Sequence, residues 1–376
     1  MVMSEHNRPG TSSPAGAMSQ RTEQAKQEGG HSPAASGLPL RQRIAAWTRR
    51  REGGGRGSLA ASGLPLRQRT AIWIRRRGVA PYLLLIPATL VIGALILWPA
   101  VQIGLFSFQN YGLQQIIGAA PAQWVGFGNY TQILHDPEFW LSLKTSVVFA
   151  VIVVPLTLIT GTLVGLLLSR LGKRMAAFVS TAALLAWATP AVSASVIFAW
   201  LVDPDGGIVN WALSKLPVWL DGGARWSGYS WTNAALPAYT VLTVMLVWTG
   251  FPFIAITVLA GLRTLPSELH DAARVDGAGP WRSFWKITFP LLKPIFLVLL
   301  LLSTIWDFGV FTQAYIITGD LGNRDEYNLG LYEYSRAFTQ PPAYGIASAV
   351  AFILTIILLI VTVGYVRAAI KQGAIA

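Results

Sequence analysis

Long uninterrupted apolar runs dominate the pattern of hydrophobic and polar positions along this chain. Each run is close to the roughly 20 residues that a helix needs to cross the hydrocarbon core of a bilayer. Prolines inside several runs are compatible with membrane helices, because neighbouring helices can satisfy the freed backbone groups. The pattern predicts six transmembrane helices. They are expected at Tyr82–Phe106, Ser146–Leu168, Ala176–Leu201, Tyr239–Leu262, Ile295–Ile317 and Ile346–Val366.

The composition leads to the same fold class. Hydrophobic residues make up 53% of the chain and charged residues only 12%, against roughly 25% charged residues in soluble domains. The first apolar run is a full span without a small-residue cleavage motif, so we expect it to remain as a helix and not to be removed as a signal peptide. The sequence therefore predicts an all-α integral membrane protein.

Charged residues near the span ends predict the orientation, because basic residues gather on the cytoplasmic side. The basic positions are Arg75, Arg76, Arg77, Arg170, Lys173, Arg174, Arg263, Arg274, Arg282, Lys286, Lys293, Arg367 and Lys371. The opposite loops are rich in acids, namely Asp136, Glu138, Asp203, Asp205, Asp221, Asp320, Asp325, Glu326 and Glu333. Both termini are therefore expected in the cytoplasm. The net charge of +12 then reflects topology and attraction to the membrane surface, and no nucleic-acid partner is expected.

Residues 1–78 form an N-terminal extension of different composition. Met1–Ala34 is rich in Ser, Gly, Gln and Pro without periodicity, which predicts disorder. A tandem repeat follows at residues 35–51 and 61–77, with Leu and Trp among clustered Arg, a composition that suits a helix on an anionic membrane face. We interpret the second copy as a duplication without a separate function; the alternative is an anchor for the membrane or a partner. Residues 79–376 form the predicted six-helix domain.

A polar segment, residues 263–294, separates the fourth and fifth apolar runs. Pro266 fits the first position of a helix, and Glu268 in the first turn is favourable for the helix dipole. The helix can run to Asp276, where Gly277 is the natural left-handed stop. A loop that only joined two helices would need about five residues. The segment is therefore expected to build a structured docking element on the cytoplasmic side.

A second short helix is expected in the same polar segment. Gly279 and Pro280 prevent direct continuation of the first helix. The second helix would contain Trp281, Phe284 and Ile287, and Pro290 and Pro294 would mark the return to the apolar phase.

The spacing of Asp271-Ala272-Ala273, Gly277, Ile287 and Pro290 resembles the "EAA" loop of bacterial ATP-binding-cassette (ABC) importer permeases. Two positions depart from the family pattern, Asp271 where Glu is usual and Phe289 where Leu is usual. The resemblance implies that the loop docks into a cleft of a cytoplasmic ATPase and transmits its motion to the membrane helices. The coupling residues it implies are Glu268, Asp271, Ala272, Ala273, Asp276, Gly277, Ile287 and Pro290.

A second resemblance lies at the first external loop. Residues there are similar to the larger-type, maltose-permease-like subunit of carbohydrate ABC importers; they are Gly126, Gly128, Asn129, Tyr130, Asp136, Pro137, Phe139 and Trp140. The resemblance implies a type I permease bundle in the bacterial cell membrane. It also implies a second permease subunit, an ATPase dimer that binds ATP and Mg²⁺, and an extracytoplasmic solute-binding protein. The large periplasmic insertion of the enterobacterial maltose permease is missing, so contacts assigned to that insertion cannot be transferred.

One acidic residue, Asp307, lies inside the fifth apolar run, and ionisable residues at such positions usually face a bundle interior or a water-filled path. It is accompanied by an aromatic and amide-rich set, Trp306, Phe311, Gln313 and Tyr315. Aromatic faces can cover the apolar side of a sugar ring while amides and carboxylates bind its hydroxyls. These five residues are the candidate substrate path. The alternative is that Asp307 makes a helix–helix hydrogen bond and the aromatic residues only pack.

Signatures of enzymes and metal sites are missing from the sequence. No phosphate-binding G-x-x-x-x-G-K-[ST] motif occurs, so ATP would be hydrolysed by another chain. The four histidines are scattered, and the chain has no cysteine for disulfides or thiolate metal sites. The chain is thus expected to be a transport subunit without a catalytic residue, a metal or a cofactor of its own.

The expected substrate is a neutral sugar, a di- or oligosaccharide, because no Lys or Arg within the predicted spans could pair with an anion beside Asp307. A permease for another solute, such as glycerol phosphate or an amino acid, is an alternative. An ion-coupled secondary transporter is a further alternative, but it would need several buried charges and an inverted repeat. A structural or receptor membrane protein would leave the polar loop and Asp307 unexplained.

Overall fold

The computed structural model describes residues 80–220, 224–319, 324–339 and 341–371. The N-terminal extension and both copies of its repeat lie outside the described residues, as do Asp221 and Asp320. The chain divides into two units, residues 1–89 and 90–376. Of the first unit, the structure describes residues 80–89, which are helical and begin α4 (Ala80–Ile92).

The regular structure of the described residues consists of helices and two short strands that pair in antiparallel register, β1 (Gln109–Asn110) and β2 (Gln123–Trp124). The helices in its first half are α4, α5 (Trp98–Phe106), α6 (Leu113–Ile116), α7 (Gly128–Leu134), α8 (Pro137–Arg170), α9 (Lys173–Trp187), α10 (Ala191–Leu201) and α11 (Ile208–Ser214). Those in its second half are α12 (Ala235–Leu262), α13 (Ser267–Val275), α14 (Pro280–Ser283), α15 (Phe289–Phe308), α16 (Thr312–Thr318), α17 (Leu329–Phe338) and α18 (Tyr344–Lys371). Short π-helices at Gly93–Leu97 and Phe284–Thr288 connect α4 to α5 and α14 to α15.

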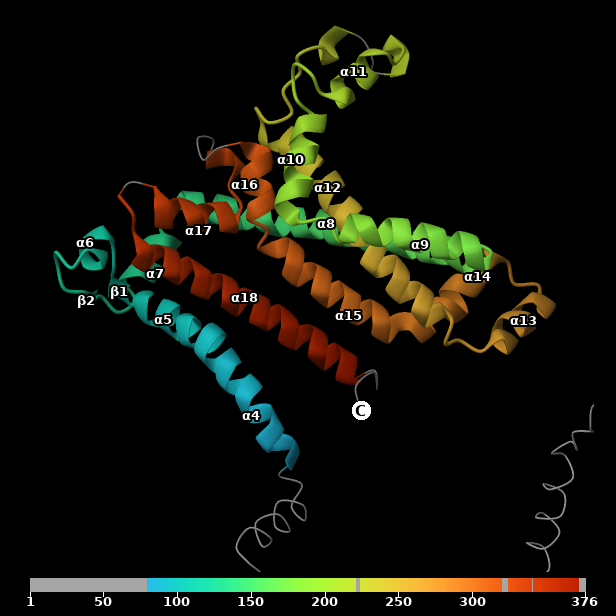
Figure 1. The fold of residues 1–376 in the computed structure, drawn as a ribbon, viewed down its shortest axis with the longest axis horizontal. Coiled ribbons are helices and arrows are strands. Elements are labelled where there is room, and N and C mark those ends of the chain that lie inside the picture. The colour runs from blue at the N-terminus through green and yellow to red at the C-terminus, as the bar shows by residue number, and fades with distance from the viewer. Residues whose placement is uncertain (1–79, 221–223, 320–323, 340, 372–376) are drawn as a thin grey trace, which may run out of the picture. The chain divides into compact units, whose positions relative to one another are not determined.

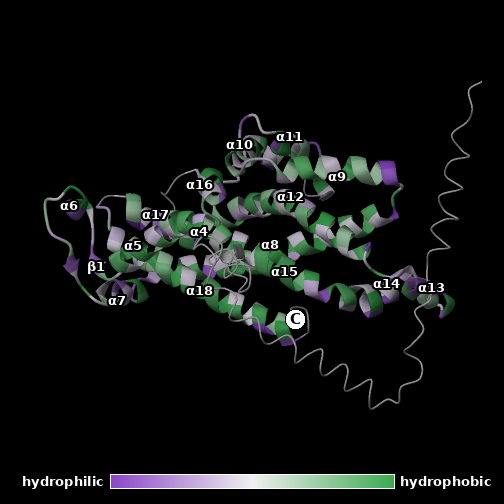
Figure 2. Ribbon diagram, turned by 60° about the horizontal axis from the view of Figure 1, so that its bottom comes forward, coloured by the Kyte–Doolittle hydropathy of each residue, from purple (hydrophilic) through white to green (hydrophobic). Residues whose placement is uncertain are grey.

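Five of the described helical segments are long and apolar enough to cross a membrane. They are Leu84–Phe106, Pro137–Arg170, Ala235–Leu262, Pro280–Phe308 and Tyr344–Lys371. Helices α9 and α10 form a sixth candidate, but they meet at an angle of 93°. The predicted all-α membrane fold is confirmed, and Figure 2 shows apolar residues along α8, α12, α15 and α18. Many of these side chains, such as Leu163 and Ile360, are exposed in the isolated chain, as residues that face lipid or another subunit would be.

The third predicted span, Ala176–Leu201, is wrong as a straight helix. The structure breaks it after Trp187, and Pro190 stands in an extended conformation as the N-cap of α10. Proline cannot donate a backbone hydrogen bond, and it biases the residue before it away from the helical region. The Pro190 peptide therefore ends one helix and starts the next in a new direction, which Figure 1 shows at the α9–α10 corner.

The fifth predicted span, Ile295–Ile317, is wrong at both ends. The continuous helical segment begins at Pro280, so α14, the π-helix and α15 form one unit, and the short helix expected to be separate is the first part of this span. The segment ends at Phe308, and α16 follows as a distinct helix that is closed by Gly319 at φ +80°. The side-chain amide of Asn328 donates to the carbonyl of Val310 at 2.6 Å, which satisfies a backbone group freed by the break.

Helices α8 and α12 make the most extensive contact of the fold. Glycines allow the two backbones to approach closely: a Cβ on Gly161 would lie 2.6 Å from the Ile254 side chain, and one on Gly165 would lie 2.8 Å from the Ala255 carbonyl oxygen. Gly161 and Gly165 form a G-x-x-x-G pair, a spacing that favours close helix association in membranes. This pair was not predicted from the sequence.

Helix α17 is fastened to the beginning of α8 by a partly buried polar network. The hydroxyl of Tyr332 donates to Asp136 Oδ2 at 2.7 Å, and Arg336 donates to the same oxygen at 2.5 Å and to Glu138 Oε2 at 2.9 Å. Asp136 also caps α8 through the backbone amide of Glu138. The backbone amide of Leu329 donates to Ser146 Oγ at 2.9 Å. Asp136 and Glu138 therefore join α17 to α8. The sequence alone placed them only among the acidic residues of the external loops.

The close glycine contact generates a stability prediction. We expect Gly161→Ala to lower the free energy of unfolding by about 1–3 kcal/mol, the range for overpacking a dense interface. Gly364→Ala is the matched control, because nothing lies within 4 Å of a Cβ at that position of α18. Thermal unfolding of the two detergent-solubilised variants measures the difference in stability. Equal unfolding midpoints would show that the close approach of α8 and α12 at Gly161 does not constrain the size of the side chain there.

Candidate functional site

The first half of the polar loop forms α13 (Ser267–Val275). Pro266 is the N-cap and not the first helical residue as predicted, and Glu268 lies in the first turn as expected. The end of the helix matches the prediction, since Asp276 is the C-cap and Gly277 has φ +71°. The Gly277 amide donates to the Arg274 carbonyl at 3.0 Å and the Ala278 amide to the Ala273 carbonyl at 2.8 Å. These two bonds form a Schellman motif, which requires the left-handed residue.

The two faces of α13 differ in burial. Ala273 is buried against the rest of the chain, whereas the other predicted coupling residues of the helix are exposed, namely Glu268, Asp271, Ala272 and Asp276. Among the described residues, the ion pair of Asp271 is an exposed one with Arg274 at 3.3 Å, a kind of pair that contributes little to stability. Val275 is 88% exposed at the end of the helix. The outward face thus offers acidic, small and apolar side chains to a partner.

The second half of the loop joins α13 to a membrane helix. His270 Nδ1 lies 3.3 Å from Ser283 Oγ, which links α13 to α14. Ile287 lies in the π-helix and is half-buried, and Pro290 lies exposed near the start of α15. Aromatic rings pack against one another along this segment. The ring of Trp285 contacts those of Trp281, Phe284 and Phe289, with centroids 5.1–5.6 Å apart.

The continuous helix carries this loop to Asp307. From Pro280 to Asp307 the chain is helical without a gap, a distance of about 40 Å at the helical rise. Asp307 lies on the last turn of α15 and is half-buried. Within the described residues no hydrogen bond or ion pair joins it to another side chain, so the helix–helix hydrogen bond considered above finds no partner in the described part of this chain.

The five candidate path residues lie on or next to two helices and form two separate groups. Trp306 packs edge-on against Phe253 of α12, with centroids 5.5 Å apart, and Phe253 stacks on Trp187 of α9. The remaining three, Phe311, Gln313 and Tyr315, lie beyond the break at Gly309, on or next to α16.

The structure adds residues to the second aromatic group that the sequence analysis missed. Phe311 stacks on Tyr334 of α17 with ring centroids 4.7 Å apart, and Tyr315 lies 5.4 Å from the same ring. The chain continues to Phe338, 4.7 Å from Tyr334. Glu333, also on α17, is removed from water by the fold, and this burial raises the pKa of its carboxyl to about 7. The aromatic contacts between α16 and α17 join residues about 20 positions apart, and no local pattern indicates them.

A lysine inside a span was also missed. Helix α8 begins at Pro137, nine residues before the predicted start at Ser146, so the candidate span contains Lys144. Lys144 lies two residues before the predicted second span, so the predicted spans still contain no Lys or Arg, but the helix that includes this span carries a basic residue near its start. Lys144 lines a groove between α8 and α12, and Asp307 is not among the residues of that groove.

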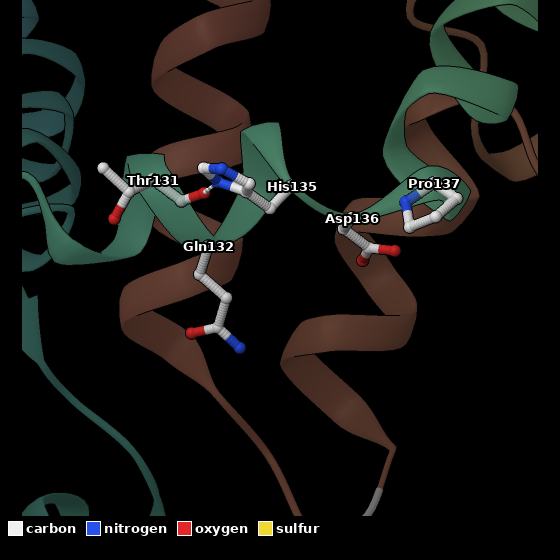
Figure 3. Close-up of a pocket in the computed structure, with 5 residues that line it drawn as sticks. All are labelled: Thr131, Gln132, His135, Asp136 and Pro137. Atoms are coloured by element: carbon white, nitrogen blue, oxygen red, sulfur yellow. Dashed lines mark hydrogen bonds between the residues drawn. The ribbon is translucent and has the colours of Figure 1, made fainter.

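An open pocket at the α7–α8 junction offers no reactive arrangement. It is lined by Thr131, Gln132, His135, Asp136 and Pro137 (Figure 3). His135 Nδ1 lies 2.7 Å from the carbonyl oxygen of Thr131, and the Asp136 side chain points away from the His135 ring. Asp136 is already engaged by Tyr332 and Arg336. Across the described ranges, no group of three or more His, Cys, Asp or Glu side chains could hold a metal ion.

Comparisons with known proteins agree with this geometry. The family model for the binding-protein-dependent transport system inner membrane component matches residues 158–373. The diacetylchitobiose uptake system permease protein of Streptomyces coelicolor is 39% identical over 78% of this chain and 88% of its own length. The sulfoquinovosyl glycerol transport system permease protein of Agrobacterium fabrum is 33% identical over 76% and 88%, respectively.

A solved structure shows the same fold. A chain of a bacterial ABC transporter involved in the import of the acidic polysaccharide alginate aligns with a TM-score of 0.65 at 20% identity. The alignment covers 81% of this chain and 99% of that one.

Proposed function

This chain belongs to the family of binding-protein-dependent transport system inner membrane components, and from that premise we propose that it is one of two permease subunits of an ATP-driven importer for a neutral di- or oligosaccharide. The observation that carries the proposal is the 39% identity to a diacetylchitobiose uptake permease over 88% of the relative's length. The second relative is named for sulfoquinovosyl glycerol, a sulfonated and therefore anionic glycoside; it supports a glycoside substrate, and the neutral charge is argued from Asp307 alone. The chain would lie in the bacterial inner membrane, with α13 in the cytoplasm.

The coupling part of the proposal rests on α13 and the helix behind it. The exposed face with Glu268, Asp271 and Ala272 would dock into a cleft of a separate ATPase, which would bind ATP and Mg²⁺. Since α13 connects to the continuous Pro280–Phe308 segment, movement of the ATPase would displace the helix that carries Asp307. Nucleotide would thereby bias an equilibrium between two states of the membrane helices. A second permease, an ATPase dimer and an external solute-binding protein complete the proposed assembly.

The substrate part of the proposal rests on the polar and aromatic groups at the outer end of α15. Asp307 makes no ion pair in the described part of the chain, so its carboxylate is available to bind sugar hydroxyls. The rings of Trp306, Phe311 and Tyr315 offer faces for the apolar side of a sugar, although they come from two separate groups. A phosphate placed beside Asp307 would set two like charges together at a cost of several kcal/mol. These features favour a neutral sugar.

Substitution at the end of α13 tests the coupling. We expect Gly277→Asp to insert into the membrane but to abolish uptake, because φ +71° costs an L-residue about 1–2 kcal/mol and would distort the Schellman motif. Gly279→Asp is the matched control: it adds the same charge at φ −67°, at the N-cap of α14, where Asp is favoured. ATP-driven uptake into proteoliposomes that contain the complete assembly is measured alongside ATP hydrolysis. Normal uptake by the Gly277→Asp variant would refute the docking assignment.

Substitution of Asp307 tests the substrate path. Asp307→Asn should keep most of the uptake rate, because the amide can still accept and donate hydrogen bonds to hydroxyls. Asp307→Ala should slow uptake about fivefold or more, the effect of losing a hydrogen bond worth roughly 1 kcal/mol, without lowering the amount of folded protein in the membrane. If the alanine variant transports at the wild-type rate, Asp307 does not contact the substrate.

Competition between solutes tests the charge of the substrate. Uptake of a radiolabelled disaccharide into proteoliposomes with the cognate binding protein should be inhibited by unlabelled neutral oligosaccharides. Phosphorylated or sulfonated sugars should not compete, because nothing among the described path residues can neutralise them. Efficient import of an anionic sugar with no competition from neutral ones would overturn the substrate class and leave the permease assignment in place.

A further inference from the structure

An apolar groove lies between the first halves of α8 and α12, and it is not part of the coupling loop or of the candidate path. Its volume is about 510 Å³. The lining residues are Leu141, Lys144, Thr145, Val148, Phe149, Ile152, Leu236, Tyr239, Thr240, Thr243 and Val244. We call it the α8–α12 groove. Both helices begin at the same end of it, which is the external end in the predicted orientation.

Most of the hydroxyl groups in the α8–α12 groove are already satisfied. Thr240 donates to the Leu236 carbonyl at 2.8 Å, and Thr243 donates to the Tyr239 carbonyl at 2.7 Å. The hydroxyl of Tyr239 donates to the Glu326 carbonyl at 2.8 Å. A threonine bonded to its own helix presents mainly its methyl group outward. The walls of the groove therefore accept a hydrocarbon chain without loss of hydrogen bonds.

Lys144 is the only charged residue among those that line the groove. It is exposed, and within the described ranges no ion pair or hydrogen bond engages its ammonium group. Trp140, one turn earlier, is half exposed and its indole N–H donates to the Leu134 carbonyl at 2.9 Å, a placement typical of tryptophans at the headgroup level. Helix α8 has 34 residues and is about 50 Å long, well beyond the roughly 30 Å hydrocarbon core. Lys144 can therefore reach the headgroups from the edge of the hydrocarbon.

We propose that the α8–α12 groove binds a phospholipid with an anionic headgroup, with an acyl chain along the groove and the phosphate on Lys144. The apolar walls supply the affinity for the chain, and the unpaired ammonium supplies the preference for net negative charge. One lysine near a membrane surface contributes about fivefold in affinity for anionic lipid. A helix of a second permease would be a different occupant, and it would have to bring an acidic side chain to Lys144 to avoid leaving a charge unpaired.

Lipid titration of the purified full-length protein with its copurifying subunits tests the headgroup. Native mass spectrometry compares phosphatidylglycerol and phosphatidylcholine with identical acyl chains. Lys144→Gln should weaken phosphatidylglycerol binding about fivefold and leave phosphatidylcholine binding unchanged. Lys215→Gln is the matched control, because Lys215 is exposed at the end of α11 and does not line the groove. An unchanged lipid preference in Lys144→Gln, or an equal loss in Lys215→Gln, overturns the proposal.

Two further variants test the groove itself and do not depend on the transported solute. Val148→Trp should fill the groove and weaken the binding of both lipids. The chain contains no cysteine, so Val244→Cys introduces a single thiol into the groove. A phosphatidylglycerol with a photoreactive acyl chain should label α8 and α12. A short-range cross-link from the Val244→Cys thiol to a copurifying permease, without lipid labelling, would show that protein occupies the groove and would overturn the proposal.

Discussion

Backbone and side-chain polar groups that enter the hydrocarbon have to find partners within the protein, because no water is present to replace them. The long helices satisfy this requirement through their own backbone hydrogen bonds. Their threonine hydroxyls donate to carbonyls one turn earlier, as Thr157 does to Val153 and Thr304 does to Leu300. The helical path is interrupted where other groups supply the bond. At the break after Phe308, Asn328 reaches from the start of α17 to the Val310 carbonyl. At this break, the side chain of a distant residue meets the requirement.

Helix α17 contacts the chain at the break after Phe308, and ion pairs and hydrogen bonds fix the position of α17 itself. Tyr332 and Arg336 on one face bind the acids that begin α8, while Tyr334 on another face stacks on Phe311. The partly buried ion pairs and the aromatic stack therefore position the same short helix from two sides. Through this helix, the geometry at the Phe308 end of α15 depends on residues that are nearly 200 positions apart in the sequence.

The proposed coupling loop and Asp307 lie at the two ends of one helical segment. The Schellman motif at Gly277 fixes the direction in which the chain leaves α13, and the segment Pro280–Phe308 continues as a helix to Asp307. The segment connects α13 to Asp307 without a gap, and it includes the π-helix Phe284–Thr288 and Pro294, which are sites where helices bend. Asp307 and Lys144 are ionisable groups on membrane-length helices, and within the described residues no hydrogen bond or ion pair engages either side chain. They are the positions where we place sugar and lipid, respectively. Buried or membrane-level charges of this kind indicate function more often than structure.

The sequence by itself determined the membrane class, the approximate positions of most spans, and the end of α13 at Gly277, because these follow from local composition and from the conformational freedom of glycine. It also identified the polar loop and Asp307, since a charge or a polar segment between apolar runs is visible without a structure. The bend at Pro190 and the end of the fifth span at Phe308 were decided by tertiary structure, because a proline or glycine in an apolar run is compatible with both a kink and a straight helix. The pairing of Phe311 with Tyr334, of Arg336 with Asp136, and of Gly161 with Ile254 depends on which helices meet. Periodicity along one helix carries no information about its neighbour, so these contacts emerged only from the packed fold.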